Sequence, residues 1–504
     1  MLSILLAAAV TFRAPQIIPV PEKMEYKENV EVKLDSTTEV KVKCPDKIAA
    51  GWVADHISEW FKQKPKVCAN SSDVDLANEE AYILTAKPGV ITIEAKSIKG
   101  VRYAMFTLRQ VAERASEGYR LKHYRMPEFT VVDSPVLKFR GIHFCWLPEL
   151  SASYIEREIR TAAQYKFNYV VIESWGVFKS ERHPWFGWKA GAMNKKTIAK
   201  FKAIADDLGV TLIPQLNVWG HASGARSCAG KHASLDFSPE YQPLFEPAGG
   251  AHGSVSSAWN WCLTNPEAVR TVHELVEEMH DAFGCPPFFH IGCDEADVPT
   301  CASCRAVQYS KLVSNYISGI CELLRKRGAR AMMWHDMLIQ QGDPRWKGFY
   351  ANGDAETAKL PKVLPKDVVI CDWYYGSDPG GTRDPNSRSS NTMTYPTLEY
   401  FSKECGFDTL TCPWEEPKGL RSQMKFARDT GLFGVLETTW HHFGGERYPR
   451  MFQMSACGAW GRGEHLSNGH FATAWRQCGW DAGNQTYKDG GWYDTQVTRD
   501  ILSR

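Results

Sequence analysis

The 504-residue sequence has no block of basic residues, and its 59 Lys and Arg are balanced by 58 Asp and Glu to a formal charge of +1. Proteins that bind nucleic acid gather positive charge to neutralise phosphates, so the balance argues against a nucleic-acid partner. After the N-terminus, no stretch reaches the roughly 18 apolar residues of a membrane span. No Gly-rich phosphate fingerprint follows any expected strand, and no fixed-period repeat is present.

Residues 1–15, "MLSILLAAAVTFRAP", contain a short apolar run and small residues but no basic segment before them. Such a run is typical of a signal peptide, so we expect a secreted or periplasmic protein, with a cytoplasmic one as the alternative. Fifteen cysteines are an odd number, so at least one thiol must stay unpaired within the chain.

The composition, with 43% hydrophobic and 23% charged residues, is that of a globular protein, and the length predicts several domains. Residues 16–130 alternate in strand fashion around two helical stretches, at 48–63 and 97–114, which predicts a small α+β domain. The segment "MPEFTVVDSPVLK" that begins at Met126 is interpreted as a connector. The tail, residues 455–504, is rich in Trp and Gly and is expected to pack on the domain before it.

Between residues 136 and 454, eight short apolar segments alternate with amphipathic helical ones. This count predicts a (β/α)8 barrel, with an open doubly wound sheet as the alternative. The predicted strands are FRGIHF, YVVIES, TLIPQLNV, FFHIGC, RAMMWHD, VVICDW, DTLTCPW and GVLETTW.

Active sites of such barrels form at the carboxyl ends of the strands. Seven of the eight predicted ends carry a tryptophan, at positions 146, 175, 219, 334, 373, 414 and 440. Indole faces stack on the C–H faces of sugars, so we interpret these residues as a ring that lines a carbohydrate site. The alternative is aromatic filler in a large core.

The fourth strand ends in Asp294 and Glu295. Neighbouring carboxylates repel unless their protonation states differ, which acid/base chemistry requires, so we interpret them as a catalytic pair. The alternative is a solvated pair at the start of a helix. His290, Cys293, Cys301 and Cys304 could offer ligands to zinc, but a closed metal site there would consume the pocket. A loop thiol pair or disulfide between Cys301 and Cys304 is the simpler interpretation, and we expect neither metal nor cofactor.

Several motifs resemble those of the family 20 glycoside hydrolases, the β-N-acetylhexosaminidases. "HIGCDE" is similar to the family's His-x-Gly-Gly-Asp-Glu signature, with Cys293 at the second glycine. "VVDSPVLKFRGIHF" resembles the segment that opens the family's barrel, and "LIPQLNVWGHASG" resembles its third-strand element. The stretch from Glu80 to Val111 resembles the small domain that precedes that barrel. The resemblance covers roughly residues 16–450.

The resemblance implies a retaining mechanism in which the substrate's own 2-acetamido oxygen attacks C1 to form an oxazolinium intermediate. It implies that Glu295 is the general acid and base and that Asp294 holds the acetamido N–H. Arg140 would grip sugar hydroxyls, and His221 would stand behind the carboxylates. The implied acetamido pocket is closed by Trp334, Trp373 and Trp440.

The sequence also departs from the family pattern. Gln215 and Asn217 replace an acidic pair on the third strand, and Glu173 is the only carboxylate at the end of the second. The family's seventh-strand tyrosine is absent; Trp414 takes its place, and Tyr374 or Tyr375 could reach in from the sixth strand. His441 and His442 stand where many members have a glutamate. We therefore keep two alternatives to a hexosaminidase that acts on terminal GlcNAc or GalNAc: a non-catalytic glycan-binding protein and a zinc-dependent hydrolase.

Overall fold

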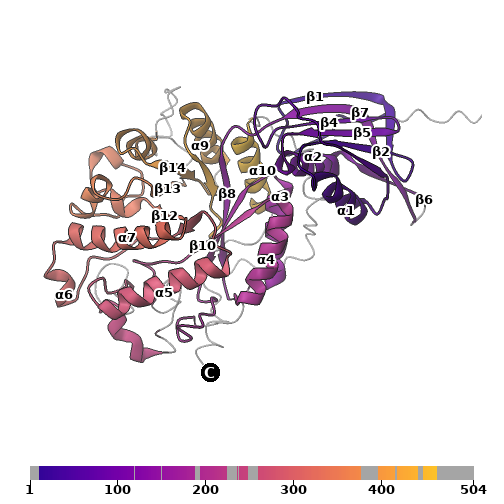
Figure 1. The fold of residues 1–504 in the computed structure, drawn as a ribbon. Coiled ribbons are helices and arrows are strands. Elements are labelled where there is room, and N and C mark those ends of the chain that lie inside the picture. The colour runs from indigo at the N-terminus through magenta and orange to yellow at the C-terminus, as the bar shows by residue number, and fades with distance from the viewer. Residues whose placement is uncertain are drawn as a thin grey trace, which may run out of the picture. The chain divides into compact units, whose positions relative to one another are not determined.

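The computed structural model describes residues 11–117, 120–148, 150–187, 193–223, 235, 238–247, 259–375, 395–414, 417–440 and 447–461. These residues form two compact units (Figure 1). The first unit holds residues 11–136, 163–166 and 456–461, and the second holds the described parts of 137–162 and 167–455. The predicted leader, most of the 455–504 extension, His441 and His442 lie outside the described residues.

The first unit contains a seven-stranded mixed sheet in the order β1-β7-β4-β5-β2-β3, with β6 paired to β7. Alternate residues are buried in β4 and β5, which marks one face as the core face. Two helices pack on the sheet, α1 (Ala49–Phe61) and α2 (Ile98–Val111). The strands are β1 (Lys23–Leu34), β2 (Glu39–Lys43), β3 (Lys66–Asn70), β4 (Tyr82–Lys87), β5 (Val90–Ala95), β6 (Glu113–Glu117) and β7 (Arg120–Asp133).

The segment interpreted as a connector is part of this sheet. Residues from Met126 to Asp133 form the second half of β7, which lies between β1 and β4. Pro127 argued against a central strand because proline cannot donate to the ladder. It is tolerated because β1 has a register irregularity between Lys27 and Glu31, and Pro127 faces Glu31 there.

The second unit is a closed barrel of eight parallel strands, which confirms the predicted (β/α)8 fold with a small α+β domain before it. Buried residues from all eight strands fill the interior, among them Phe139, Val171, Ile213 and Leu436. The strands are β8 (Phe139–Trp146), β9 (Tyr169–Ser174), β10 (Thr211–Gln215), β11 (Phe288–His290), β12 (Arg330–Trp334), β13 (Val369–Trp373), β14 (Asp408–Cys412) and β15 (Gly434–Glu437).

Helices surround the strands of the barrel (Figure 1). They are α3 (Ala152–Gln164), α4 (Lys195–Leu208), α5 (Pro266–Ala282), α6 (Ala302–Arg305), α7 (Tyr309–Lys326), α8 (Pro396–Glu399), α9 (Pro417–Thr430) and α10 (Arg447–Trp460). Three 3₁₀ turns follow β12, at Asp336–Leu338, Pro344–Trp346 and Thr357–Lys362, and Pro361 inside the third cannot continue an α-helix. Within the described chain, no helix is both long enough and apolar enough to cross a membrane.

Candidate active site

The chain turns sharply after the short strand β11. Gly292 has φ +67°, Cys293 φ 77° and Glu295 φ 48°. Left-handed conformations are costly for residues with a side chain and tend to persist at functional sites. Of the seven non-glycine residues with positive φ in the described chain, four lie at this site: His221, Cys293, Glu295 and Trp440.

The turn gives the two carboxylates different surroundings. The Asp294 side chain is buried, with 7% of its surface exposed, whereas that of Glu295 is 36% exposed. Burial in a low-dielectric site restricts Asp294 to a partner that can donate a hydrogen bond to it, while Glu295 can exchange protons with solvent. The structure thus separates the two residues as acid/base chemistry requires.

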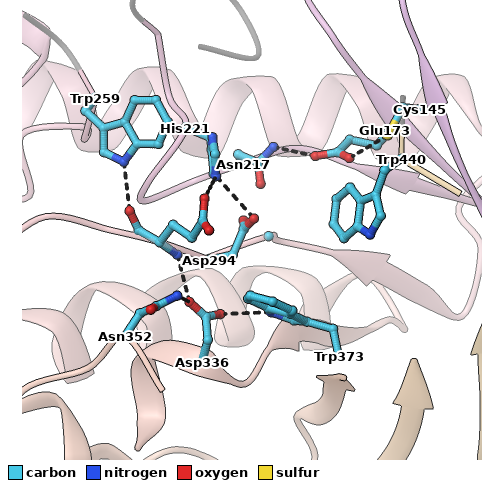
Figure 2. Close-up of polar contacts among 12 residues, drawn as sticks. Cys145, Glu173, Asn217, His221, Trp259, Asp294, Asp336, Asn352, Trp373 and Trp440 are labelled. Atoms are coloured by element: carbon cyan, nitrogen blue, oxygen red, sulfur yellow. Dashed lines mark hydrogen bonds and ion pairs between the residues drawn. The ribbon is translucent and has the colours of Figure 1, made fainter. Parts of the chain in front are cut away.

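His221 joins the pair from the loop after β10 (Figure 2). Its Nε2 lies 3.1 Å from Glu295 Oε2 and 3.3 Å from Asp294 Oδ2. The loops can approach because Gly220 has no side chain, and a Cβ there would overlap the Asp294 carbonyl oxygen. The predicted place of His221 behind the carboxylates agrees with this geometry.

Asp336, which follows β12, holds the loop from the other side (Figure 2). Its Oδ2 accepts the Glu295 backbone N–H at 2.9 Å and an amide hydrogen of Asn352 at 3.0 Å, and its Oδ1 accepts the Trp373 indole N–H at 3.2 Å. Burial, with the nearby charge of Asp294, raises the pKa of Asp336 to about 6. Asp336 lies two residues after the strand-end Trp334, where a carboxylate can reach the mouth of the barrel.

Trp259 also contacts the site, although it follows no strand. Its indole N–H donates to the Glu295 carbonyl oxygen at 2.8 Å, and its ring lies 4.3 Å from the His221 ring. No sequence pattern marked this residue, because its segment has no regular secondary structure.

The residues that replace the family's acidic network form a buried cluster. Glu173 accepts hydrogen bonds from Asn217 Nδ2 at 2.8 Å and from the Cys145 thiol at 3.3 Å, and it lies 3.1 Å from His143 Nε2. Asn217 fits closely against Gly292, where a Cβ would overlap Asn217 Oδ1. Asn217 therefore connects the end of β9 to the catalytic turn.

Four predicted tryptophans form one aromatic wall with Tyr375. Ring centroids lie 5.5 Å apart for Trp334 and Trp440, 5.3 Å for Trp373 and Tyr375, and 5.2 Å for Tyr375 and Trp414. The Trp440 indole N–H donates to the Tyr375 hydroxyl at 2.6 Å. Side chains alternate between the two sides of a strand, and each of these residues lies on the side that faces the barrel interior.

The prediction that seven strand-end tryptophans line one carbohydrate site was wrong in part. The Trp146 ring lies 5.4 Å from Phe201 of α4, and that of Trp219 lies 6.1 Å from Tyr309 of α7, so both pack toward helices. Strand alternation explains Trp146, because it shares its side of β8 with Phe144, whose ring lies 5.7 Å from Phe452 of α10.

Arg140 is the second residue of β8, and its buried side chain donates from Nη1 to the Leu137 carbonyl at 2.8 Å, at the amino end of the strand. Its contact with sugar hydroxyls stays a prediction. One further site prediction, that of Tyr374, needs correction. The Tyr374 ring stacks on Phe349 at 4.6 Å and shares the outward side of its strand with Asp372, so Tyr375 takes its place.

Three groups of side chains in the described chain could hold a metal ion: His221 with Asp294 and Glu295; His143 with Cys145 and Glu173; and Glu246 with Cys262, Cys301 and Cys304. The zinc set considered from the sequence is not among them. His290 instead packs its ring 4.4 Å from Trp334, and Cys293 is a buried free thiol. Cys301 and Cys304 are free thiols as well, which fits the loop thiol pair and not the disulfide of the two forms considered from the sequence.

Two curated relatives are similar to parts of this chain. Lacto-N-biosidase of Bifidobacterium bifidum is 24% identical over 325 residues, which are 60% of this chain and 25% of that protein. Beta-hexosaminidase of Porphyromonas gingivalis is 24% identical over 294 residues, 52% of this chain and 36% of that protein. The chain thus spans about a quarter to a third of the length of these two relatives.

Two solved structures share the fold. The family 20 exo-β-N-acetylglucosaminidase of Vibrio harveyi aligns with a TM-score of 0.67 and 18% identity, over 93% of this chain and 77% of its own. The β-N-acetylhexosaminidase of Bacteroides fragilis aligns with a TM-score of 0.65 and 18% identity, over 94% and 96%. At these identities the likeness establishes the fold.

Family models match both units of the chain. Residues 14–134 match "Glycosyl hydrolase family 20, domain 2" and residues 145–401 match "Glycosyl hydrolase family 20, catalytic domain". The catalytic-domain match alone covers half of the chain, and it contains Asp294, Glu295 and their partners His221 and Asp336. The chain is therefore a divergent member of glycosyl hydrolase family 20.

Proposed function

We propose that the protein is a glycosidase that removes terminal β-linked N-acetylhexosamine, GlcNAc or GalNAc, by a retaining, substrate-assisted mechanism. The observation that carries the proposal is the split between the buried Asp294 and the half-exposed Glu295 at the mouth of the barrel. The family membership and the names of the two relatives agree with it.

In this mechanism Glu295 protonates the leaving glycosidic oxygen and then accepts a proton from water. Asp294 accepts a hydrogen bond from the acetamido N–H, which favours attack of the acetamido oxygen on C1 and stabilises the positive charge of the oxazolinium. His221 Nε2, in contact with both carboxylates, holds them in place. Asp336 and Trp259 fix the backbone of Glu295 through its N–H and its carbonyl oxygen.

The aromatic wall would surround the acetamido group. The Tyr375 hydroxyl accepts the Trp440 indole N–H and also hydrogen-bonds the Thr438 hydroxyl. Its own hydrogen would turn from Thr438 to the acetamido oxygen when substrate binds. Exclusion of water by the indoles strengthens the electrostatic contacts inside the pocket. Tyr375 thus supplies the hydroxyl that the family carries on its seventh strand.

The test is a screen of aryl N-acetylglucosaminide and N-acetylgalactosaminide on wild type, Asp294→Asn and Glu295→Gln. We expect kcat to fall by about 10²–10⁴-fold in each variant. Glu295→Gln should lose less on substrates with an acidic leaving group, which needs no general acid. Glu322→Gln, an exposed glutamate of α7, is the matched control and should keep full activity.

Sugar binding without turnover in the wild type would instead support a non-catalytic glycan-binding protein, the alternative motivated by the neutral Gln215 and Asn217. Activity that requires zinc and is unchanged in Glu295→Gln would support a zinc-dependent hydrolase. Either result would overturn the proposed mechanism.

The proposal extends to location. The apolar run in residues 1–15 favours a secreted or periplasmic protein. N-terminal sequencing of the mature protein from fractionated cells tests this: an intact Met1 in the cytoplasmic fraction would contradict it.

A further inference from the structure

Three cysteines and a glutamate lie together at the start of α6, a few residues after Glu295, and have no part in the proposed chemistry. Cys262 Sγ lies 3.9 Å from Cys301 Sγ and 3.8 Å from Cys304 Sγ, and Cys301 Sγ lies 3.3 Å from Glu246 Oε1. Cys262, Cys304 and Glu246 are buried. These four ligand atoms lie within 4.8 Å of one another.

The separations fit a tetrahedral zinc ion. With Zn–S bonds of about 2.3 Å and a Zn–O bond of about 2.0 Å, tetrahedral angles place two sulfurs about 3.8 Å apart and a sulfur and an oxygen about 3.5 Å apart. The observed sulfur separations are far from the ~2.05 Å of a disulfide. Two sulfur–sulfur separations and one sulfur–oxygen separation thus match those of a tetrahedral zinc site, and the remaining separations are within 4.8 Å.

The backbone around the thiols is also that of a zinc-binding turn. Cys301 and Cys304 are spaced as Cys-x-x-Cys at the start of α6, and the Cys304 N–H donates to Cys301 Sγ at 3.3 Å. The spacing is typical of the first half of a structural zinc site, and N–H donors stabilise the negative charge of a thiolate. Cys262 comes from a separate segment, as the second half of such a site does.

Glu246 supplies the argument for a cation. Its Oε2 accepts the backbone N–H groups of Thr300 at 2.9 Å and Cys301 at 2.8 Å, which leaves Oε1 directed at the thiols. Among the described residues, no Lys, Arg or His forms an ion pair with Glu246. A buried carboxylate beside three thiols calls for a positive charge, which a metal ion would provide.

We propose that Glu246, Cys262, Cys301 and Cys304 bind one structural Zn²⁺. The four ligands close the coordination sphere, so the ion has no open position for a substrate and its role is to hold segments together. The site differs from the set of His290, Cys293, Cys301 and Cys304 considered from the sequence, and it leaves the pocket free.

The zinc would clamp the segment that carries Glu295 to its neighbour. Residues 259–262 and 294–304 already meet at two other points: Trp259 donates to the Glu295 carbonyl, and Asn260 Nδ2 donates to the Asp297 carbonyl at 2.5 Å. Glu246 reaches the same place because Phe245 forms a bridge with Trp261. Loss of the ion would loosen three segments around the catalytic turn.

The first experiment measures metal in the full chain, purified under reducing conditions, by plasma mass spectrometry. We expect about one zinc per chain, retained in Glu295→Gln and in Cys285→Ser, an exposed-cysteine control, and lost in Cys262→Ser and Cys304→Ser. Because zinc content does not depend on turnover, this result is independent of the proposed function.

The second experiment covers the case in which the cysteine variants fail to fold. Glu246→Gln keeps an acceptor for the two backbone N–H groups and all three thiols, so it should fold and bind zinc about 10–100-fold more weakly. Removal of zinc from the wild type with a chelator should lower Tm by about 5 °C or more, and Zn²⁺ should restore it. Co²⁺ in its place should show the thiolate-to-cobalt charge transfer and strong visible bands of a tetrahedral site.

The proposal is overturned if the purified reduced chain holds less than about 0.1 zinc and neither Zn²⁺ nor Co²⁺ gives a shift in Tm or a thiolate charge-transfer band. It is also overturned if Cys304→Ser folds and keeps its zinc, because the ion would then lie elsewhere.

Discussion

Cys293 holds a left-handed backbone, with φ 77°, in the place where the family signature has glycine. Its thiol is buried, so substitution by glycine removes both a strained conformation and a packed side chain. The two effects oppose each other at about 1 kcal/mol each. The residue is thus tolerated in the turn and is not required for the chemistry.

We predict that Cys293→Gly changes the free energy of unfolding by less than about 1 kcal/mol and keeps activity. Cys293→Val should destabilise by about 2–3 kcal/mol, because a β-branched side chain fits poorly at positive φ. Urea denaturation measures both. Cys321→Gly, at a buried position in the regular helix α7, is the control and should lose about 2 kcal/mol or more. If Cys293→Gly and Cys321→Gly lower the free energy of unfolding equally, the backbone at Cys293 is not strained.

A second prediction at this scale concerns the two adjacent tyrosines. Tyr375→Phe removes the hydroxyl proposed to meet the acetamido oxygen, so kcat should fall by about 10–100-fold. Tyr374→Phe, whose ring packs on Phe349 outside the barrel, should change kcat by less than about twofold. Steady-state kinetics on an aryl N-acetylhexosaminide separate the two, and an equal effect would refute the assignment.

At the scale of elements, the site depends on how closely the loops after β10 and β11 approach. Gly220 and Gly292 each lie where a Cβ would overlap the neighbouring loop, at the Asp294 carbonyl and at Asn217 respectively. His221 can reach both carboxylates only because the two loops touch. Backbone contact between elements therefore sets the position of catalytic side chains that come from different strands.

We expect Gly220→Ala to lower kcat at least tenfold and to cost about 2–3 kcal/mol of stability, because the added methyl must push the Asp294 carbonyl away. Gly51→Ala in α1 is the control: its Cβ meets nothing within 4 Å, and the change should stabilise the helix by up to about 1 kcal/mol. Kinetics and thermal unfolding measure both. Unchanged kcat in folded Gly220→Ala would show that the loop contact does not position the carboxylates.

At the scale of the whole molecule, buried carboxyls tie stability to pH. Burial raises the pKa of Glu158 to about 7, that of Asp336 to about 6 and that of Glu437 well above its usual value. In the unfolded chain these groups ionise near pH 4 to 4.5, so at higher pH the unfolded state releases protons that the folded state keeps. Stability should therefore fall as pH rises from about 4.5 to 7.

Glu158→Gln should remove part of this dependence of stability on pH. Glu158 on α3 is fully buried, and its contribution to the loss between pH 4.5 and 7 is about 3 kcal/mol at most. The free energy of unfolding of the variant should therefore rise relative to that of wild type as pH rises through this window. Calorimetry at pH 5 and pH 8 measures the difference. Glu59→Gln, at an exposed position of α1, is the control and should keep the wild-type slope. A Glu158→Gln slope equal to that of wild type would show that Glu158 stays ionised in the folded protein.

Strand alternation decides which of two neighbouring residues faces the barrel interior. Residues two apart on a parallel strand share a side, so Trp373 and Tyr375 face the barrel interior whereas Asp372 and Tyr374 face the helices. The same rule places Trp146 on the outer side of β8. Alternation alone would have replaced Tyr374 by Tyr375.

The sequence by itself determined the eight strands, the order of the two domains and the place of Asp294 and Glu295 after the fourth barrel strand, because each rests on local hydrophobic period or on adjacent residues. It could not determine Trp259, the Asn217–Gly292 contact or the meeting of Glu246 and Cys262 with Cys301 and Cys304. Those residues come from segments far apart in the chain, and only closure of the barrel and packing of its loops bring them together. Local interactions thus define the elements, and tertiary packing decides which side chains share a site.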